Sequence, residues 1–162
     1  MSTGFEIDRL RRRLLRAGLG SSVLAVAFVA TLTRPLRALA ADWPKAAFEA
    51  VDLDAALKNA GIVDAATSTD IILKAPEIAE NGAQVPVEIA SRIPGSQTIY
   101  IFVDKNPQPF AGSFDFLNGA EPFIATRIKM GETSNLRVVV LAGGKYYMVA
   151  REVKVTIGGC AN

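Results

Sequence analysis

The hydrophobic pattern of the chain begins with helical spacing and later changes to the alternation that is typical of β-strands. Asp52 stands where it can cap a helix that carries Leu53 and Leu57 at positions i and i+4. Gly61 follows this helix at the position where glycine commonly ends one. With a shorter helical stretch before it, the segment 41–66 is therefore predicted to form two short helices.

The region 67–157 consists of short runs rich in β-branched and aromatic residues, separated by turn residues. The run 98–103 is apolar on both faces, which predicts a central strand. The run 145–157 is long for one strand, so we expect a β-bulge within it. Six or seven antiparallel strands at this spacing predict a mainly β protein, an immunoglobulin-like β-sandwich preceded by the two short helices.

One hairpin is predicted from a short motif. Asn81-Gly82 lies between the strand-like runs 71–78 and 85–93, and Asn-Gly in this setting is a strong signal for a tight turn. Pro76 and Pro86 have no backbone N–H to donate, so we expect this pair of strands at or near the edge of a sheet.

Composition restricts the chemistry that is available. The 162 residues include one cysteine and no histidine, which excludes histidine-dependent triads, Cys-His dyads, Cys₄ clusters and an intrachain disulfide. Asp52, Asp54 and Asp64 lack the spacing of a calcium loop, and helix capping explains them better. We therefore expect no catalytic residues, no metal site and no resident cofactor.

The net charge of +2 depends on the first forty residues. Seven of the 18 basic residues and two of the 16 acidic residues lie there, which leaves 11 basic and 14 acidic residues in 41–162. A mildly acidic body with scattered basic side chains lacks the basic patch that nucleic acid binding requires, so we expect no nucleic acid partner.

Residues 1–40 have the three parts of a cleaved signal peptide: a basic region, an apolar region at 17–32 and a small-x-small motif at 38–40. The apolar region is shorter than the roughly 20 residues of a membrane-spanning helix, so we expect no stable membrane anchor. Arg11-Arg12 followed by Leu14-Leu15 resembles a twin-arginine signal, which predicts export of a folded protein to the periplasm. An ordinary secretory signal is the alternative.

The candidate chemistry lies in the C-terminal segment 158–162. After the last predicted strand the chain continues Gly158-Gly159-Cys160, and two glycines before a thiol predict a thin, flexible arm. Fully extended, 158–160 reaches about 10 Å, so the thiol can enter a narrow pocket of another protein. Cys160 is therefore the candidate site residue, with Gly158 and Gly159 as the carrier arm. The simpler alternative is an incidental cysteine in the tail.

These features together resemble the SoxY family, the sulfur carriers of bacterial thiosulfate oxidation. The specific part of the resemblance is Gly158-Gly159-Cys160, because members of that family typically end Gly-Gly-Cys-Gly-Gly. This chain has Ala161 and Asn162 in place of the last two glycines. The resemblance implies that Cys160 holds sulfur intermediates covalently in the periplasm, and that the chain itself catalyses none of the steps.

The resemblance also implies partners. These are a SoxZ-like subunit that forms a heterodimer, a haem-containing enzyme that couples thiosulfate to Cys160, a thiosulfohydrolase and, where present, a sulfane dehydrogenase. Two alternatives stay open. One is a non-catalytic periplasmic immunoglobulin-like binding or assembly domain whose Cys160 forms a structural intermolecular disulfide. The other is a SoxY-like carrier that serves a different sulfur or redox system.

Overall fold

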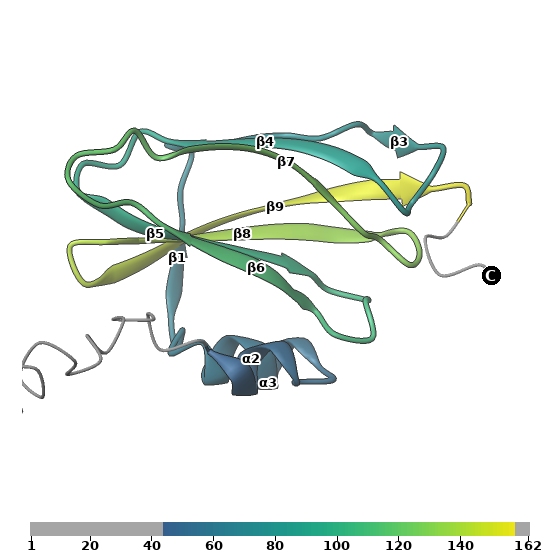
Figure 1. Ribbon diagram of the computed structural model, residues 1–162, viewed down its shortest axis with the longest axis horizontal. Helices are drawn as coiled ribbons and strands as arrows, with labels where there is room; N and C mark the ends of the chain where they lie inside the picture. Colours follow the sequence, from purple (N-terminus) through teal and green to yellow (C-terminus); the bar gives the residue numbers. More distant parts are fainter. Residues whose placement is uncertain (1–43, 158–162) are drawn as a thin grey trace, which may run out of the picture. The chain divides into compact units, whose positions relative to one another are not determined.

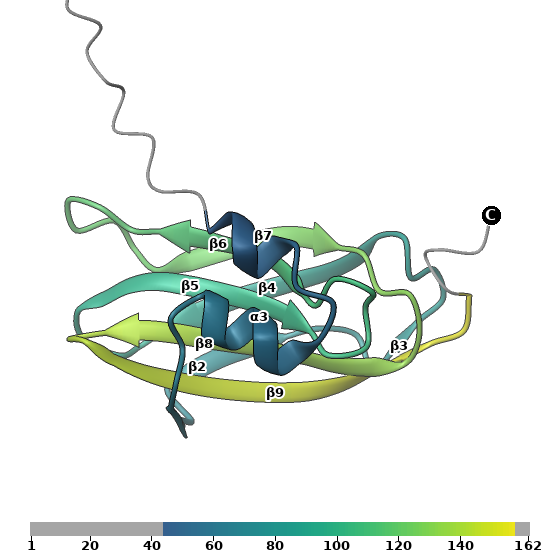
Figure 2. The ribbon, with the colours of Figure 1, turned by 90° about the horizontal axis from the view of Figure 1, so that it is seen from below.

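Residues 44–157 are described by the computed structural model, and they form two packed β-sheets with two short helices on one outer face (Figure 1). The helices lie over strands of the larger sheet, as the view from below shows (Figure 2). The predicted leader, 1–40, lies outside the described residues, and the predicted domain boundaries stay predictions. In chain order the elements are α2 (Lys45–Phe48), α3 (Leu53–Asn59), β1 (Ala65–Thr67), β2 (Ile71–Lys74), β3 (Ile78–Ala79), β4 (Val85–Ser91), β5 (Ser96–Val103), β6 (Phe110–Asp115), β7 (Phe123–Ile128), β8 (Ser134–Ala142) and β9 (Lys145–Val155).

The larger sheet has the strand order β1-β9-β8-β5-β6, and β3 pairs with the end of β9. The smaller sheet has the order β2-β4-β7. Neighbouring strands are antiparallel except β1 and β3, which run parallel to β9. Two facing sheets preceded by two short helices confirm the predicted immunoglobulin-like sandwich. The expected six or seven strands were too few, because β1 and β3 are too short to show an alternating pattern.

The main core lies between the two sheets, and its residues alternate along each strand with the period of two that a pleated strand requires. The fully or almost fully buried side chains of this core include Val85, Val87 and Ile89 of β4, Ile99, Ile101 and Val103 of β5, and Leu136, Val138 and Val140 of β8.

A second, smaller core lies between the larger sheet and the helices. Phe102 points to this side of β5 and packs with Phe110 and Val139 beneath α2 and α3. The ring centroids of Phe102 and Phe110 are 5.0 Å apart, and those of Phe110 and Phe48 are 4.3 Å apart. Because β5 is covered on both faces and lies between β8 and β6, the prediction of a central strand at 98–103 is confirmed.

The helix α3 begins and ends as its sequence predicts. The carboxylate of Asp52 accepts a hydrogen bond from the backbone N–H of Ala55 at 2.8 Å, which caps the first turn. Gly61 adopts a φ of +78°, and the N–H groups of Gly61 and Ile62 donate to carbonyls of the last turn. None of the helices within 44–157 is long and apolar enough to cross a membrane.

The predicted tight hairpin at Asn81-Gly82 is wrong. β2 and β4 do pair in antiparallel fashion, but β2 ends at Lys74, and the chain then crosses to the larger sheet as β3 before it returns to β4. The side chain of Asn81 accepts a hydrogen bond from the N–H of Ala83 at 2.8 Å. This local turn lets the chain change direction without a direct connection between the two strands.

The prediction that this pair of strands lies at or near a sheet edge is confirmed, because β2 is an edge strand of the smaller sheet and β4 is its neighbour. Pro86 fits there because it lies beyond the last β2–β4 pair, Lys74 with Glu88, so only β7 borders it. The expected bulge in the last strand is wrong, because β9 pairs with β8 without a register shift. The register shifts occur in β5 instead.

Candidate functional site

The structure describes the chain up to Ile157, the residue before the predicted carrier arm. Gly158, Gly159 and Cys160 lie outside the described residues, so their predicted roles stay predictions. The four residues 154–157, which we call the arm root, are described, and they show how the sandwich holds the chain where the arm begins (Figure 1).

The arm root extends past the strand that would normally hold it. The last residue pair between β9 and β8 is Val153 with Ser134. Beyond this pair, a segment at 77–82 that contains β3 lies along the arm root on the other side. We call this the crossing segment, because it leaves the smaller sheet to pair with the larger one. In its first part, the N–H of Lys154 donates to the carbonyl of Glu77 at 2.9 Å.

Further hydrogen bonds continue to the last described residue. The N–H of Thr156 donates to the carbonyl of Ala79 at 3.1 Å, and its hydroxyl donates to the carbonyl of Glu80 at 3.0 Å. The carbonyl of Ile157 accepts from the N–H of Gly82 at 2.8 Å. On the opposite side, the N–H of Val155 donates to the hydroxyl oxygen of Thr133 at 2.9 Å. Each residue of the arm root is therefore bonded to a fixed part of the fold.

The crossing segment is itself anchored in the sandwich. Ala79 is buried in the main core, beside the partly buried side chain of Val155. The carbonyl of Gly82 accepts a hydrogen bond from the N–H of Met130 at 2.7 Å, and Met130 is fully buried. The arm root is thus attached to the core of the protein rather than to another loose loop.

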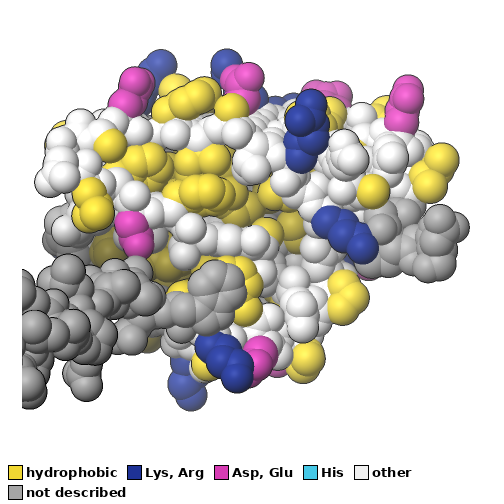
Figure 3. Space-filling view, in the orientation of Figure 1, with side chains coloured by type: hydrophobic (Ala, Val, Ile, Leu, Met, Phe, Trp, Pro, Cys, Tyr) yellow, Lys and Arg dark blue, Asp and Glu magenta, His cyan; other side chains and the backbone are white. Residues whose placement is uncertain are grey.

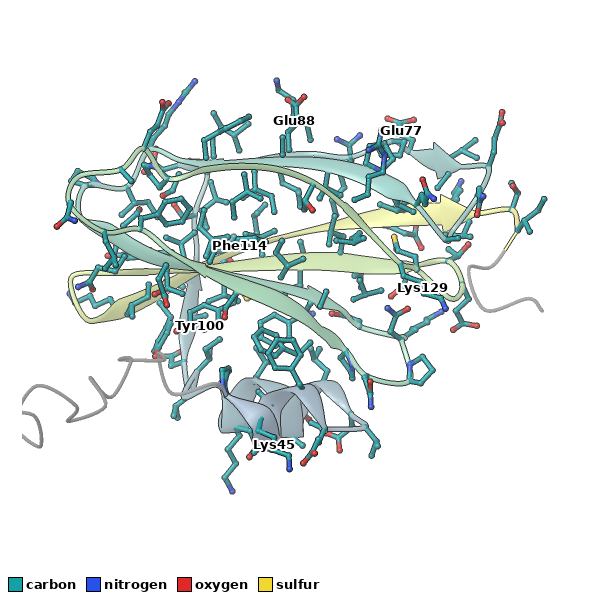
Figure 4. All side chains as sticks on the ribbon, viewed as in Figure 1. Lys45, Glu77, Glu88, Tyr100, Phe114 and Lys129 are labelled. Carbon is teal, nitrogen blue, oxygen red and sulfur yellow. The ribbon has the colours of Figure 1, made fainter. Side chains whose placement is uncertain are left out.

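Charged side chains of both signs surround this end of the sandwich. Glu77 and Lys129, labelled in Figure 4, lie here, and the Glu77 carboxylate is 3.5 Å from the guanidinium of Arg151. Ile78 and Ile157 are exposed large apolar side chains of the same region. The Glu77–Arg151 pair is largely exposed, so it adds little to stability.

A less exposed ion pair lies elsewhere, between Arg137 of β8 and Asp104, the residue after β5. The Nε and Nη2 atoms of Arg137 lie 3.1 and 2.9 Å from the two carboxylate oxygens of Asp104. Hydrogen bonding to Asp104 raises the pKa of Arg137. Across 44–157 no three histidine, cysteine or carboxylate side chains gather where they could hold a metal ion.

The aromatic run 110–116 contains both buried and exposed side chains. Phe110 is buried beneath the helices, whereas Phe114 remains 39% exposed and is labelled in Figure 4. Leu117 and Phe123, which sequence reasoning did not single out, are 73% and 50% exposed. β6 and β7 are edge strands of the two sheets. Figure 3 shows a band of apolar side chains on the face of the molecule where these two edges lie. Exposed apolar clusters of this kind commonly mark protein contacts.

Comparison with known proteins identifies the family. The family described as "Sulfur oxidation protein SoxY" matches residues 56–160, well over half of the chain. The chain belongs to the SoxY family. The SoxY match includes the crossing segment, the arm root and the predicted arm as far as Cys160. Membership supports the role of a carrier protein in sulfur oxidation that works with partners of the Sox system.

A solved structure supports the same conclusion. The sulfur carrier protein SoxY from Chlorobium limicola f thiosulfatophilum is 50% identical over 63% of this chain and 89% of that chain, with a TM-score of 0.58. A superoxide reductase (neelaredoxin) from Ignicoccus hospitalis is 18% identical over 52% of this chain and 79% of its own, with a TM-score of 0.47, too low to support any argument. No curated protein sequence matches the chain.

Proposed function

We propose that this SoxY-family protein is a periplasmic carrier that holds sulfur intermediates of thiosulfate oxidation covalently on Cys160 and presents them to partner enzymes. Gly158 and Gly159 serve as the thin arm that carries the thiol. The observation that carries this proposal is that the family match runs through the glycines to Cys160, the only cysteine of the chain. The chain supplies the attachment point and its partners supply the catalysis, so it needs no resident cofactor.

The chemistry of a thiol suits this role. A cysteine thiolate forms sulfur–sulfur bonds, which a serine hydroxyl cannot do. In the loading step, the Cys160 thiolate and thiosulfate together lose two electrons and form one sulfur–sulfur bond, and the haem-containing partner accepts the electrons. Hydrolysis by a thiosulfohydrolase then releases sulfate and leaves a persulfide. Where a sulfane dehydrogenase is present, it oxidises the remaining sulfur before a second hydrolysis frees the thiol.

The shape of the carrier explains why one protein can serve several enzymes. The proposed arm follows the arm root in the chain, and three residues such as 158–160 span about 10 Å when fully extended. Each partner enzyme therefore needs only a narrow channel that admits small residues. Intermediates bound to Cys160 do not diffuse away, and their local concentration at each partner is high.

We further propose a SoxZ-like subunit as the stable partner and the twin-arginine pathway as the export route. The exposed side chains of Phe114, Leu117 and Phe123 give such a subunit an apolar surface to cover. Export in the folded state allows a partner without its own leader to cross the membrane with this chain. The twin-arginine pattern within 1–40 supports this route.

The intact mass of the protein tests the proposal. Protein is isolated from the periplasm of its native host, grown with and without thiosulfate, and measured before and after reduction. We expect reducible sulfur or thiosulfonate adducts in the thiosulfate culture, and none on the matched Cys160→Ser variant. A bare thiol under both conditions, or a disulfide to another protein chain alone, contradicts the carrier and supports an assembly domain instead.

A further inference from the structure

A carrier arm works best when it leaves the protein at a fixed point, since the position of its origin sets which volume the thiol can reach. We infer that the crossing segment, 77–82, together with Thr133 forms a clamp that fixes the arm root, so that the proposed carrier arm begins at Gly158. This inference rests on the proposed function, and it adds positioning residues that lie far from Cys160 in the sequence.

The arrangement of the strands leaves the arm root without support from β8. Strand β9 continues past its antiparallel neighbour β8, whose last pair is Ser134 with Val153. Chain ends that extend beyond their neighbours usually fray. The arm root does not depend on β8, because five hydrogen bonds at 2.8–3.1 Å connect it to the crossing segment and to Thr133.

The clamp is itself held by the core of the sandwich. The crossing segment interrupts the connection between β2 and β4, which are paired in the smaller sheet, to reach β9 of the larger sheet. Its residues Ala79 and Gly82 are buried, and Gly82 is bonded on one side to Ile157 and on the other to Met130. The crossing segment is therefore anchored in the core and bonded to Ile157. This arrangement suits a clamp that positions the residues after Ile157.

Release of the clamp should lower the effective concentration of the Cys160 thiol at a partner enzyme by an amount that can be calculated. With the arm root fixed, three residues, 158–160, separate the fold from the thiol. With the arm root free, seven residues, 154–160, do so. The effective concentration of a tethered group falls as about the −3/2 power of the tether length, so full release lowers it roughly 3- to 4-fold. We expect transfer between Cys160 and a partner enzyme to slow by up to this factor.

Two of the five hydrogen bonds use side-chain hydroxyls, so these two can be removed by substitution. Thr156 donates from its hydroxyl to the carbonyl of Glu80, and Thr133 accepts the N–H of Val155. The double variant T133V/T156V removes both bonds while it preserves side-chain shape. The matched control T133S/T156S keeps both hydroxyls.

Amide hydrogen exchange tests whether the clamp exists, with the mature full-length protein and its partner subunit. We expect the N–H groups of Val155 and Thr156 to be protected in the wild type. In T133V/T156V they should exchange about tenfold faster, because each lost hydrogen bond weakens the local structure by an amount that corresponds to several-fold in an opening equilibrium. The serine control should resemble the wild type. Unprotected amides in the wild type, or equal rates in the valine and serine variants, overturn the inference.

Transfer kinetics test whether the clamp positions the arm. We expect kcat/KM for thiosulfate loading of Cys160 by the haem-containing partner to fall in T133V/T156V, by less than the 3- to 4-fold of full release because three backbone hydrogen bonds of the clamp remain, and to be unchanged in the serine control. Alkylation of Cys160 by iodoacetamide should be equal in all variants, since a small reagent needs no fixed arm. Unchanged loading despite faster exchange overturns the positioning role. If wild-type Cys160 takes up no sulfur, the proposed function fails, and the exchange rates still decide whether the clamp exists.

Discussion

Arg137 and Asp104 form the least exposed ion pair in the described part of the chain, and it allows a quantitative prediction. Their side chains are 19% and 15% exposed, and two hydrogen bonds at 2.9 and 3.1 Å join the guanidinium to the carboxylate. Arg137→Met leaves the Asp104 carboxylate mostly buried without its partner. Breaking a fully buried pair costs about 3–5 kcal/mol, and because water still reaches both side chains we expect about 2–3 kcal/mol.

The assay is urea unfolding of Arg137→Met, Asp104→Asn and the double variant, together with thermal unfolding. For a domain of roughly 115 residues, 1 kcal/mol corresponds to about 4 °C, so Arg137→Met should lower the Tm by about 8–12 °C. The summed costs of the two single variants should exceed the cost of the double variant by at least about 1 kcal/mol. In the double variant, the second substitution removes a side chain whose ion pair is already broken.

The exposed pair between Lys74 and Glu88 serves as the control. Its side chains are 70% and 52% exposed, so Lys74→Met should cost less than about 0.5 kcal/mol. The reasoning is refuted if Arg137→Met costs no more than Lys74→Met, or if the costs of Arg137→Met and Asp104→Asn simply add. Either result means that solvent screens the Arg137–Asp104 pair as it screens the others.

Three further predictions concern the fold. Phe102→Ala should lower the free energy of unfolding by about 3–5 kcal/mol, because it leaves a cavity between the larger sheet and the helices, and urea unfolding against Phe102→Leu as a smaller truncation measures it. Asp52→Ala should cost about 1 kcal/mol through loss of the cap on α3, whereas Asp52→Asn should cost less; equal losses in a denaturation series would contradict the capping role. Burial, and then the neighbouring Tyr146, raise the pKa of Tyr100 above 10, so its contribution to stability is complete below pH 10 and is lost as the pH rises through the raised value. Unfolding free energies at pH 9 and 11 should therefore fall less steeply for Tyr100→Phe than for the wild type, and identical slopes would show that Tyr100 is not responsible.

Features that depend on residues close together in the sequence were predicted correctly. The cap at Asp52 and the helix end at Gly61 follow from interactions within one helical turn. The central position of β5 followed from an apolar run on both faces, which only a strand covered on both sides can bury. The predicted carrier cysteine stood out because the composition leaves a single thiol.

The crossing segment was not predictable in this way. Asn81-Gly82 has the local preference of a hairpin turn, and that preference suggested a direct β2–β4 connection. What decides the path instead is pairing with the arm root, such as the bond from Thr156 to Glu80, 76 residues away in the chain. Pairing across such a distance leaves no periodic signal in one sequence. Exposure at Leu117 was missed for a similar reason, since it depends on how β6 and β7 are placed.

Peptide mass spectrometry of the C-terminal segment tests the central claim most directly. Trypsin cleaves after Lys154, and no lysine or arginine follows, so the peptide 155–162 contains the only cysteine of the protein. From cells that oxidise thiosulfate, we predict this peptide with persulfide or thiosulfonate groups on Cys160 that reductant removes. Recovery of the peptide only as a free thiol, or only in disulfide linkage to a peptide of another protein, would contradict the account of a sulfur carrier.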